Sequence, residues 1–445
     1  MMRMVIFLCI FPVFLAGCGL SPDERVPETQ VSSAVIAPIA SNTPLPASTK
    51  TPRVPTSTVT PFFTQTATVV PQNTSTATIQ NEQTLPDLFS SQPITITYIT
   101  MSDILNGWAI GNQPNSGDRI LYTQDGGFSW DERTPPLPDS LIEFPAEIQV
   151  WAYFYDRQTA WATFSVPHQP PVTSTPVVWH TTDAGKSWLH SEELPITGEE
   201  SFFIPEDFTF ITPENGWLLV HIDAGMSHDF SNLFSTSDGG NTWERLIDPY
   251  KEGLQSLQNT GIRFADLNLG WVTKDNLGIL PGAFLEQTRD GGLTWEDVFL
   301  PTPDEFDWFN ELSQCATSQP IFFESAKAVV LVNCRTFDEQ TFTYTYNFSS
   351  ENETWQAVSL PTSVESLFFL GNKIGWALGR DLYQTTDGGL SWVRIKTVNW
   401  DGQFSFVDTK SGWAVASNDG AIALVFTQDG GRTWQKITPK IIKLE

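Results

Sequence analysis

Four polar residues gather in one short segment, "HIDAGMSHDFSN", and their types suit a metal ion. They are His221, Asp223, His228 and Asp229. Imidazole nitrogen and carboxylate oxygen are suitable ligands for divalent transition metals. An exposed polar loop has the same composition without binding a metal, and we adopt this plainer interpretation. We therefore expect no metal and no cofactor, and we keep the four residues as a candidate binding loop.

A second group has the residue types of a carbohydrate patch. Asp304, Asp307 and Trp308 lie in the connecting segment "LPTPDEFDWFNELSQC". Carboxylates accept hydrogen bonds from sugar hydroxyls, and an indole offers a large apolar face for stacking. A solvated connection anchored by one buried Trp would have the same composition. The group is our second candidate binding loop.

The elements that must carry these loops follow from an internal repeat. "YTQDGGFSW" and "FTQDGGRTW" stand near opposite ends of the chain, and four similar boxes lie between them. A worn seventh copy, "FSSENETW", ends at Trp355, and successive copies are 37 to 60 residues apart. That spacing suits one four-stranded blade per repeat. The Asp and Trp of the six intact boxes are Asp125 and Trp130, Asp183 and Trp188, Asp238 and Trp243, Asp290 and Trp295, Asp387 and Trp392, and Asp429 and Trp434.

A Gly-Trp motif runs in step with the boxes. Examples are "NGWAI" at Trp108 and "SGWAV" at Trp413, whereas the worn unit has Val329 at this place. Seven pairs of motifs predict seven units. Each unit reads as an alternating strand, the Gly-Trp strand, a loop of variable length, a short strand, the box turn and a strand that begins at the box Trp.

The chemistry of the box explains its repetition in structural terms. Asp-Gly-Gly is turn chemistry, because Asp accepts hydrogen bonds from its own turn and Gly reaches positive φ without strain. The Ser or Thr before Trp adds a local hydroxyl, and we expect the indole to cover the turn as a buried plate. A blade cannot bury both faces alone, so the same parts recur wherever blades stack. We interpret the boxes as structural, not catalytic.

These motifs resemble the Asp-box, or BNR repeat, of sialidases, sortilin-type receptors and xyloglucanases. The joint pattern of apolar strand, Gly-Trp and Asp-box, over residues 93 to 438, resembles the photosystem II stability and assembly factor family of seven-bladed propellers. The resemblance implies an all-β, seven-bladed β-propeller and a non-enzymatic assembly protein that binds partner polypeptides. Those factors are described as presenting an Arg-rich patch, and this chain has no Arg-rich run, so a role in photosynthesis does not follow from the motifs.

Catalysis has little support in the sequence. Most glycosidases need two carboxylates beside the scissile bond, and 51 Asp and Glu residues make such a pair easy to find by chance. The Arg-Ile-Pro motif of sialidases is missing, and a xyloglucanase would typically carry two propellers. The chain has no Gly-x-Ser-x-Gly elbow, no His-Glu-x-x-His and no phosphate loop. We predict no catalytic residue, and a BNR-type glycoside hydrolase is the alternative function.

The N-terminus carries an export signal. Residues 1 to 17 hold Arg3 and then an apolar run that is too short to span a membrane. "LAGC" resembles the lipobox of bacterial lipoproteins, which implies lipidation of Cys18 and a membrane anchor. Residues 18 to 90 are rich in Thr, Ser and Pro and are expected to form a disordered tether, and residues 91 to 445 form the propeller. We expect an exported lipoprotein on the outer side of the cytoplasmic membrane or on the cell surface.

Cysteine usage agrees with export. Cys315 and Cys334 flank the first strand of the unit that lost its box, and two Cys in an exported domain commonly pair. Our hypothesis is that a disulfide substitutes for the missing box.

The net charge of −27 argues against nucleic acid as a partner. Function should lie on the face where loop lengths vary, opposite the box turns. We predict a monomer that binds a protein or a glycan at the cell surface through this face; a purely structural surface protein is a third possibility. Either "LPDLFSSQ" or the tail "KIIKLE" could close the ring, and the sequence leaves both open.

Overall fold

The structure is a computed structural model, and it is almost entirely β. In the part of the chain that the structure describes, seven sheets and one helical turn account for the regular elements, and the strands within each blade are antiparallel. It describes residues 85, 87–90, 92–166, 176–196, 202–225, 228–247, 255–256, 258–279, 282–303, 313–323, 327–351, 353–360 and 364–442. The predicted signal, Cys18 and the tether up to residue 84 lie outside these ranges.

The first four sheets are blades 1 to 4. Blade 1 holds β1 Thr95–Met101, β2 Gly107–Asn112, β3 Arg119–Thr123 and β4 Ser129–Glu132, and is followed by α1 Asp139–Ile142. Blade 2 holds β5 Gln149–Phe154, β6 Ala160–Ser165, β7 Trp179–Thr181 and β8 Leu189–His190. Blade 3 holds β9 Ile204–Phe210, β10 Gly216–Gly225, β11 His228–Thr236, β12 Glu244–Arg245 and β13 Gln255–Ser256. Blade 4 holds β14 Asn259–Phe264, β15 Gly270–Lys274, β16 Phe284–Thr288 and β17 Glu296–Phe299.

The remaining sheets are blades 5 to 7. Blade 5 holds β18 Ser313–Thr317, β19 Ile321–Phe323, β20 Lys327–Thr336, β21 Thr341–Ser349 and β22 Thr354–Leu360. Blade 6 holds β23 Val364–Leu370, β24 Ile374–Gly379, β25 Asp381–Thr385 and β26 Val393–Thr397. Blade 7 holds β27 Asp401–Phe406, β28 Gly412–Asn418, β29 Ala421–Thr427 and β30 Gln435–Lys436, and β31 Lys440–Ile442 follows it.

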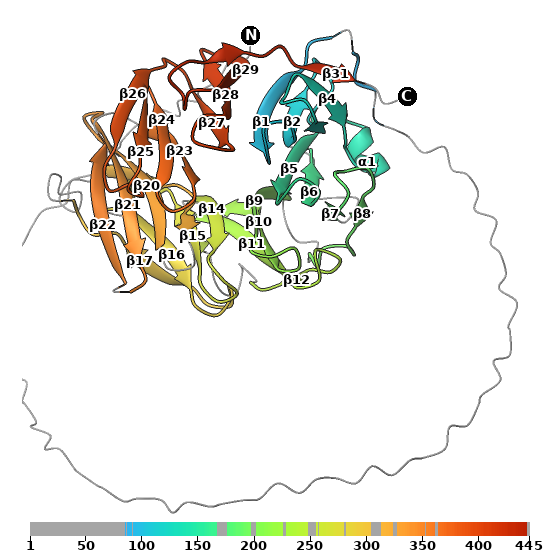
Figure 1. Cartoon of the computed structure of the whole chain (residues 1–445). Coiled ribbons are helices and arrows are strands. Elements are labelled where there is room, and N and C mark those ends of the chain that lie inside the picture. The colour runs from blue at the N-terminus through green and yellow to red at the C-terminus, as the bar shows by residue number, and fades with distance from the viewer. Residues whose placement is uncertain are drawn as a thin grey trace, which may run out of the picture. The chain divides into compact units, whose positions relative to one another are not determined.

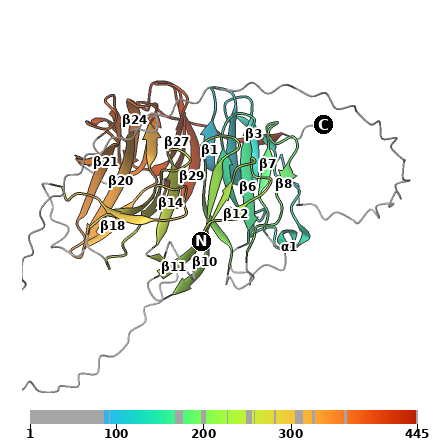
Figure 2. The same ribbon diagram turned by 90° about the horizontal axis from the view of Figure 1, so that it is seen from below.

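The seven blades form a ring, and the predicted seven-bladed β-propeller is confirmed. Figure 1 shows the first strand of each blade facing the centre and the later strands facing the rim. Figure 2 shows the ring from the side, with β10 and β11 projecting beyond the other blades. Because the strands alternate in direction, the box turns lie on one face and the loops between second and third strands lie on the other.

Each intact Asp-box is a closed hydrogen-bonded turn. In blade 7 the Thr427 hydroxyl donates to the Asp429 carboxylate (2.9 Å) and accepts from the Gly431 N–H (3.0 Å). The same carboxylate accepts from the Thr433 N–H (2.8 Å) and hydroxyl (2.7 Å). The bond from the Thr433 hydroxyl is the main cause that lowers the pKa of Asp429 to about 2. All three polar side chains are therefore used inside the turn, which supports a structural role for the box.

The Gly-Trp indoles connect neighbouring blades. Trp161, Trp217, Trp376 and Trp413 each donate an indole N–H to a glycine carbonyl in the box of the next blade, over 2.7 to 3.2 Å. Each of these indoles is at most 4% exposed. Our expectation that the box indoles are the buried plates is wrong for most blades, because among the box Trp only Trp130 and Trp243 are buried. At these four interfaces the two motifs run in step because one motif binds the other. Trp108 instead donates to the Asp156 carbonyl in blade 2 (2.9 Å).

The glycine of the Gly-Trp motif makes room for a phenylalanine. A Cβ on Gly216 would lie 2.4 Å from the Phe210 ring of the same blade. That ring stacks on Trp161 of the preceding blade with centroids 3.6 Å apart. Blade 2 has Ala160 where Gly216 stands in blade 3, and its Phe154 stacks at the wider centroid distance of 5.2 Å. The glycine thus sets how closely two blades approach.

Blade 5 departs from this scheme. Without a box in blade 5, the Trp271 indole donates to the Gln287 amide oxygen of its own blade (3.1 Å). Cys315 and Cys334 face each other on β18 and β20 and form a disulfide. Cys315 lies within the first strand of the blade and does not precede it. That the disulfide substitutes for the box stays a prediction.

The ring is closed by both ends of the domain. The tail strand β31 pairs in parallel with β4, from Lys440 opposite Ser129 to Ile442 opposite Asp131. At the other end Leu88 is buried, and the Gln113 amide donates to the Phe89 carbonyl (2.7 Å). Packing therefore begins before the predicted domain start at residue 91. Within the described residues, no helix is both long enough and apolar enough to cross a bilayer.

One box residue is strained, and its replacement should stabilise the protein. Ala184 occupies the first glycine position of its box with a φ of 61°, a left-handed conformation that glycine adopts without penalty. We expect Ala184→Gly to add about 1 kcal/mol of stability, which for a domain of this size raises Tm by roughly 1 to 2 °C. Calorimetry checks this. Gly126→Ala is the matched control and should lower Tm, since its Cβ would lie 3.0 Å from the Ile104 carbonyl; equal shifts would contradict the argument.

If the disulfide compensates for the lost box, its removal should lower the stability of the protein. Cys334→Ser opens a loop of 19 residues and should lower the free energy of unfolding by about 3 kcal/mol. Thermal unfolding of the variant and of the oxidised and reduced protein measures the effect. An unchanged Tm, or two free thiols in the purified protein by mass spectrometry, would defeat the hypothesis.

Candidate functional site

The candidate loop from His221 to Asp229 is a projecting hairpin and not a loop. β10 continues to Gly225, β11 starts at His228, and His221 lies opposite Ser231 (Figure 2). A register shift between His221 and Asp223 marks a bulge. The His221 ring stacks on Phe202 with centroids 4.7 Å apart. Continued pairing of the two strands overrode the polar composition from which we expected a loop.

The side chains of the other candidate residues lie outside the described structure. His228 and Asp229 lie opposite Gly225 and Ala224 in the hairpin, and their side chains lie outside the described structure, as do Asp304, Asp307 and Trp308. Among the described residues, no group of three or more His, Cys, Asp or Glu side chains could hold a metal ion.

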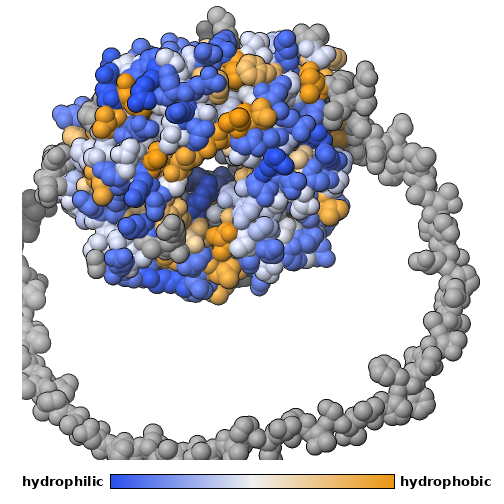
Figure 3. Space-filling model, in the orientation of Figure 1, coloured by the Kyte–Doolittle hydropathy of each residue, from blue (hydrophilic) through white to orange (hydrophobic). Residues whose placement is uncertain are grey.

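A cavity of about 460 Å³ lies against the inner strands of blades 4, 5 and 6. Its wall includes Thr260 and Arg263 of β14, the Ser318–Pro320 break, and Glu365 of β23. Figure 3 shows the ring hollowed at its centre, with hydrophilic residues in the hollow. The cavity exists because the inner strand of blade 5 is interrupted: β18 and β19 both pair with β20, and Pro320, which has no N–H to donate, stands between them.

Arg263 is held in this wall by groups from two other blades. Its guanidinium lies 2.6 Å from the Asp207 carboxylate of β9 and donates to the Gln319 amide oxygen (2.8 Å). Gln319 also donates to Asp207, and the Ile262 N–H donates to the same carboxylate (3.0 Å). Burial is the main influence on Asp207 and raises its pKa, whereas the Arg263 guanidinium acts in the opposite direction. The cluster fixes the relative positions of blades 3, 4 and 5.

Glu365 is the accessible acid of the cavity. It stands near the start of β23 and is exposed. Burial of part of the side chain is the main cause that raises the pKa of Glu365, and the negative charge of Asp401 on β27 adds to the shift. The backbones of these two strands are tied by the Ser366 hydroxyl, which donates to the Gly402 carbonyl (2.8 Å). Two carboxyl groups on the first strands of neighbouring blades, β23 and β27, therefore stand within electrostatic reach of each other.

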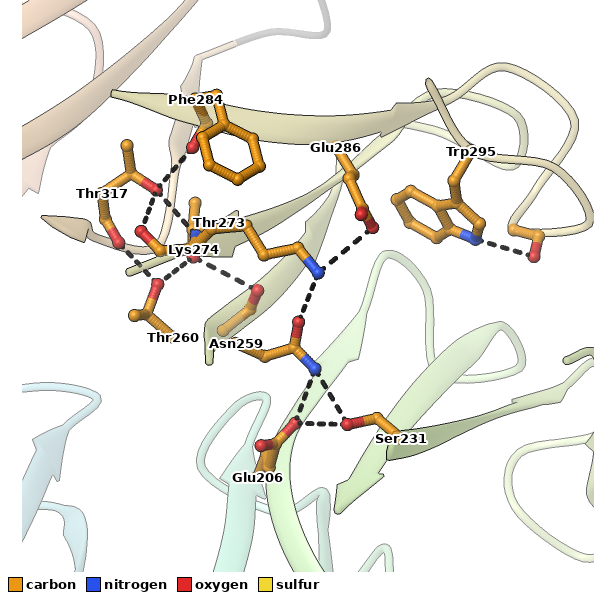
Figure 4. A network of polar contacts seen from close by, with 12 residues as sticks. Glu206, Ser231, Asn259, Thr260, Thr273, Lys274, Phe284, Glu286, Trp295 and Thr317 are labelled. Carbon is orange, nitrogen blue, oxygen red and sulfur yellow. Dashed lines mark hydrogen bonds and ion pairs between the residues drawn. The ribbon is translucent and has the colours of Figure 1, made fainter. Parts of the chain in front are cut away.

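A second polar network joins blades 3 and 4 in the interior (Figure 4). The Lys274 ammonium is fully buried, lies 3.2 Å from the Glu286 carboxylate and donates to the Asn259 amide oxygen (2.7 Å). The Asn259 amide donates to the Ser231 hydroxyl (2.8 Å). Because a buried ammonium is destabilising unless it is paired and hydrogen-bonded, this network has a structural role.

Sequence reasoning missed the central cluster. Asp207, Arg263 and Glu365 stand in first strands, where the alternating pattern directed attention to the apolar positions. A signal was present in the sequence, because a charged residue within an otherwise apolar first strand needs a charged or polar partner from another element. Gln319 could not have been found, because its importance comes from the strand break beside it.

Known structures support the fold and nothing finer. No protein-family model matches the sequence, and neither does any curated protein. A puromycin-hydrolyzing peptidase of Mycobacterium tuberculosis is similar over 83% of this chain and 57% of its own, with 11% sequence identity and a TM-score of 0.50. This protein thus spans little more than half of that peptidase.

Two further neighbours are more distant. The GH74 xyloglucanase from Xanthomonas campestris is 13% identical over 78% of this chain and 64% of its own, with a TM-score of 0.32. A Hadza microbial sialidase is 13% identical over 64% of this chain and 71% of its own, with a TM-score of 0.37. A propeller fold supports many unrelated functions, so these similarities carry no activity over to this chain.

The pairing of Arg263 with Asp207 can be tested by a double-mutant cycle. Arg263→Met leaves a buried carboxylate without its main partner and should lower the free energy of unfolding by about 3 kcal/mol. Adding Asp207→Asn should restore part of the loss, because the uncompensated charge is then removed. Denaturant unfolding of the two single variants and the double variant measures the coupling energy. Strictly additive effects would show that the two residues act independently.

Proposed function

We propose that this protein is an exported, membrane-tethered propeller that binds a neutral glycan in the cavity of blades 4 to 6 and catalyses no reaction. The observation that carries the proposal is the cavity itself, with its volume of about 460 Å³ and its wall of hydroxyl, amide and carboxyl groups. Thr260, Glu365 and Asn333 stand at the ends of their strands that lead to the variable-loop face. This position supports entry of the ligand from the variable-loop face.

The charge distribution favours an uncharged, hydroxyl-rich ligand. Arg263 is engaged by Asp207 and Gln319, so its positive charge is largely neutralised within the wall. Glu365 and the nearby Asp401 would repel a carboxylate or a sulfate. An ionised carboxylate instead accepts hydrogen bonds from sugar hydroxyls, and bonds to a charged group are stronger than those between neutral groups. Ile321 and Leu367 supply apolar wall for the C–H faces of a sugar.

Lipidation of Cys18 and a tether reaching to the propeller complete the proposal. The tether would hold the binding face away from the envelope, where an extracellular glycan is accessible. An assembly role like that of the photosystem II factors would need a protein partner. It ranks second among binding functions because no family model supports that relationship.

One observation favours a hydrolase as the alternative. A general acid of a glycosidase needs a raised pKa beside a second carboxyl group that stays ionised. The pKa of Glu365 is raised, and Asp401 contributes to the shift. In that case Glu365 would act as the acid and Asp401 as the partner carboxylate.

A panel of neutral and uronate-containing oligosaccharides tests the proposal by calorimetry on the full-length protein. We expect binding of a neutral oligosaccharide, weakened about 10-fold by Glu365→Gln because one charge-assisted hydrogen bond is lost. Glu351→Gln, on the exposed turn before β22, is the matched control and should leave the affinity unchanged. Affinity should also fall as the pH drops through the raised pKa of Glu365, since the protonated group accepts more weakly.

Three outcomes would change the conclusion. Preference for uronate-containing ligands would contradict the charge argument. Loss of affinity in both variants alike would place the ligand elsewhere. Release of reducing ends from any oligosaccharide, abolished by Glu365→Gln, would put the hydrolase first.

A further inference from the structure

The rim of the propeller is formed by the last strand of each blade, and one of these strands differs from the rest. β22 of blade 5 has seven residues, whereas β8, β12 and β30 have two, β17 has four and β26 has five. The outer edge of β4 is covered by β31. Within the described residues no strand pairs with the outer edge of β22, which presents a row of backbone N–H and C=O groups.

The composition of β22 removes the usual protection against strand pairing. Its sequence, TWQAVSL, holds no charged residue and no proline. The other outer strands of more than two residues carry charges: Glu296 and Asp297 in β17, and Arg394 and Lys396 in β26. Charged side chains and short length are the devices by which edge strands avoid new partners. β22 has neither, and Thr, Trp and Val favour extended structure.

The β22 edge is also ordered by its contacts with the rest of the protein. β22 pairs with β21 at every position, from Thr354 opposite Ser349 to Leu360 opposite Thr343, without a register shift. On one side Trp355 packs against the Trp271 and Phe348 rings, with centroids 5.1 and 4.9 Å away. On the other, Leu360 is buried. A partner strand would meet an edge that is already straight and ordered, which lowers the entropic penalty of binding.

The protein already uses this mode of pairing. The tail strand β31 adds to the outer edge of β4 through backbone pairing. We propose that the outer edge of β22 is a docking site for an extended, positively charged segment of another protein, which adds to blade 5 as a further strand. This partner is separate from the glycan of the proposed function, and its binding does not depend on the central cavity.

The charged residues around β22 favour a basic partner segment. Glu351 and Glu353 stand in the turn that leads into β22, and Arg289 is shared between Glu353 (3.1 Å) and Glu296 (3.8 Å). Beyond the opposite end, the β20–β21 turn carries Asp338 and Glu339, of which Glu339 pairs with Arg335 (3.1 Å). Carboxylates therefore outnumber cations at both ends of an uncharged strand, so a complementary segment has an uncharged centre and basic ends. A second copy of this chain, with its net charge of −27, would meet repulsion.

A synthetic peptide tests the site on the full-length protein. The probe is a fluorescent nine-residue peptide with an alternating Thr and Val centre and two Lys at each end. We expect saturable binding by fluorescence anisotropy and slower amide hydrogen exchange in β22. Gln356→Lys places a charge in the middle of the edge and should weaken binding by roughly tenfold. Val393→Lys, on the exposed face of the outer strand β26, adds the same charge one blade away and should have no effect.

Two altered peptides separate backbone pairing from simple charge attraction. A peptide with N-methyl groups on alternate backbone nitrogens keeps its charges but cannot pair along that edge, and it should not bind. A peptide with Glu in place of Lys should bind at least tenfold more weakly. Binding of the N-methylated peptide as tightly as the parent, or equal binding to the Gln356→Lys and Val393→Lys proteins, would overturn the proposal. So would self-association of the protein that Gln356→Lys abolishes, because the edge would then belong to a second copy.

Discussion

The contact between a Gly-Trp indole and the Asp-box of the next blade, made as a hydrogen bond at four blade interfaces, is the constraint on which this propeller depends. A four-stranded sheet exposes two apolar faces and cannot bury them alone. Here the indole of Trp413 closes the ring by donating to the Gly126 carbonyl of blade 1, and three other blades repeat the bond. A hydrogen bond fixes the indole in one orientation, and the stacked Phe then fixes the distance between the blades. The motif recurs along the chain because these interfaces share the same geometry.

Blade 5 illustrates the structural consequences of losing that contact. Because blade 5 lacks an intact box, the Trp271 indole donates to Gln287 of its own blade. Val329 stands at the Trp position of blade 5, so no indole binds the box of blade 6 from there. Instead the Asn347 amide donates to the Gly389 carbonyl in the box of blade 6 (3.4 Å). The blade has the longest fourth strand among the described blades, a disulfide and a broken inner strand. These changes release blade 5 from the repeat pattern, and both the central cavity and the uncovered β22 edge lie on it.

The polar groups of the interior divide into two kinds. Lys274, Glu286 and Asn259 are buried and bind one another, so they add specificity to the packing of blades 3 and 4. Asp207, Arg263 and Gln319 also satisfy one another, but they form part of a cavity wall that Glu365 completes from blade 6. The difference is geometric: the second group lies beside the break between β18 and β19, where the cavity opens.

The sequence by itself determined the number of blades, the order of strands in each and the structural role of the boxes, since periodic turn chemistry encodes local structure directly. It could not show that Trp161 reaches Gly239 or that Arg263 meets Asp207, because these contacts join residues 50 or more positions apart and depend on how blades stack. It misjudged the His221 segment, where pairing with the opposite strand outweighs polar composition. Ring closure by β31 and the cavity at Ser318–Pro320 were decided only by the tertiary structure. Both depend on which backbone N–H and C=O groups find partners once the seven blades form a ring. No single segment of the sequence carries that information.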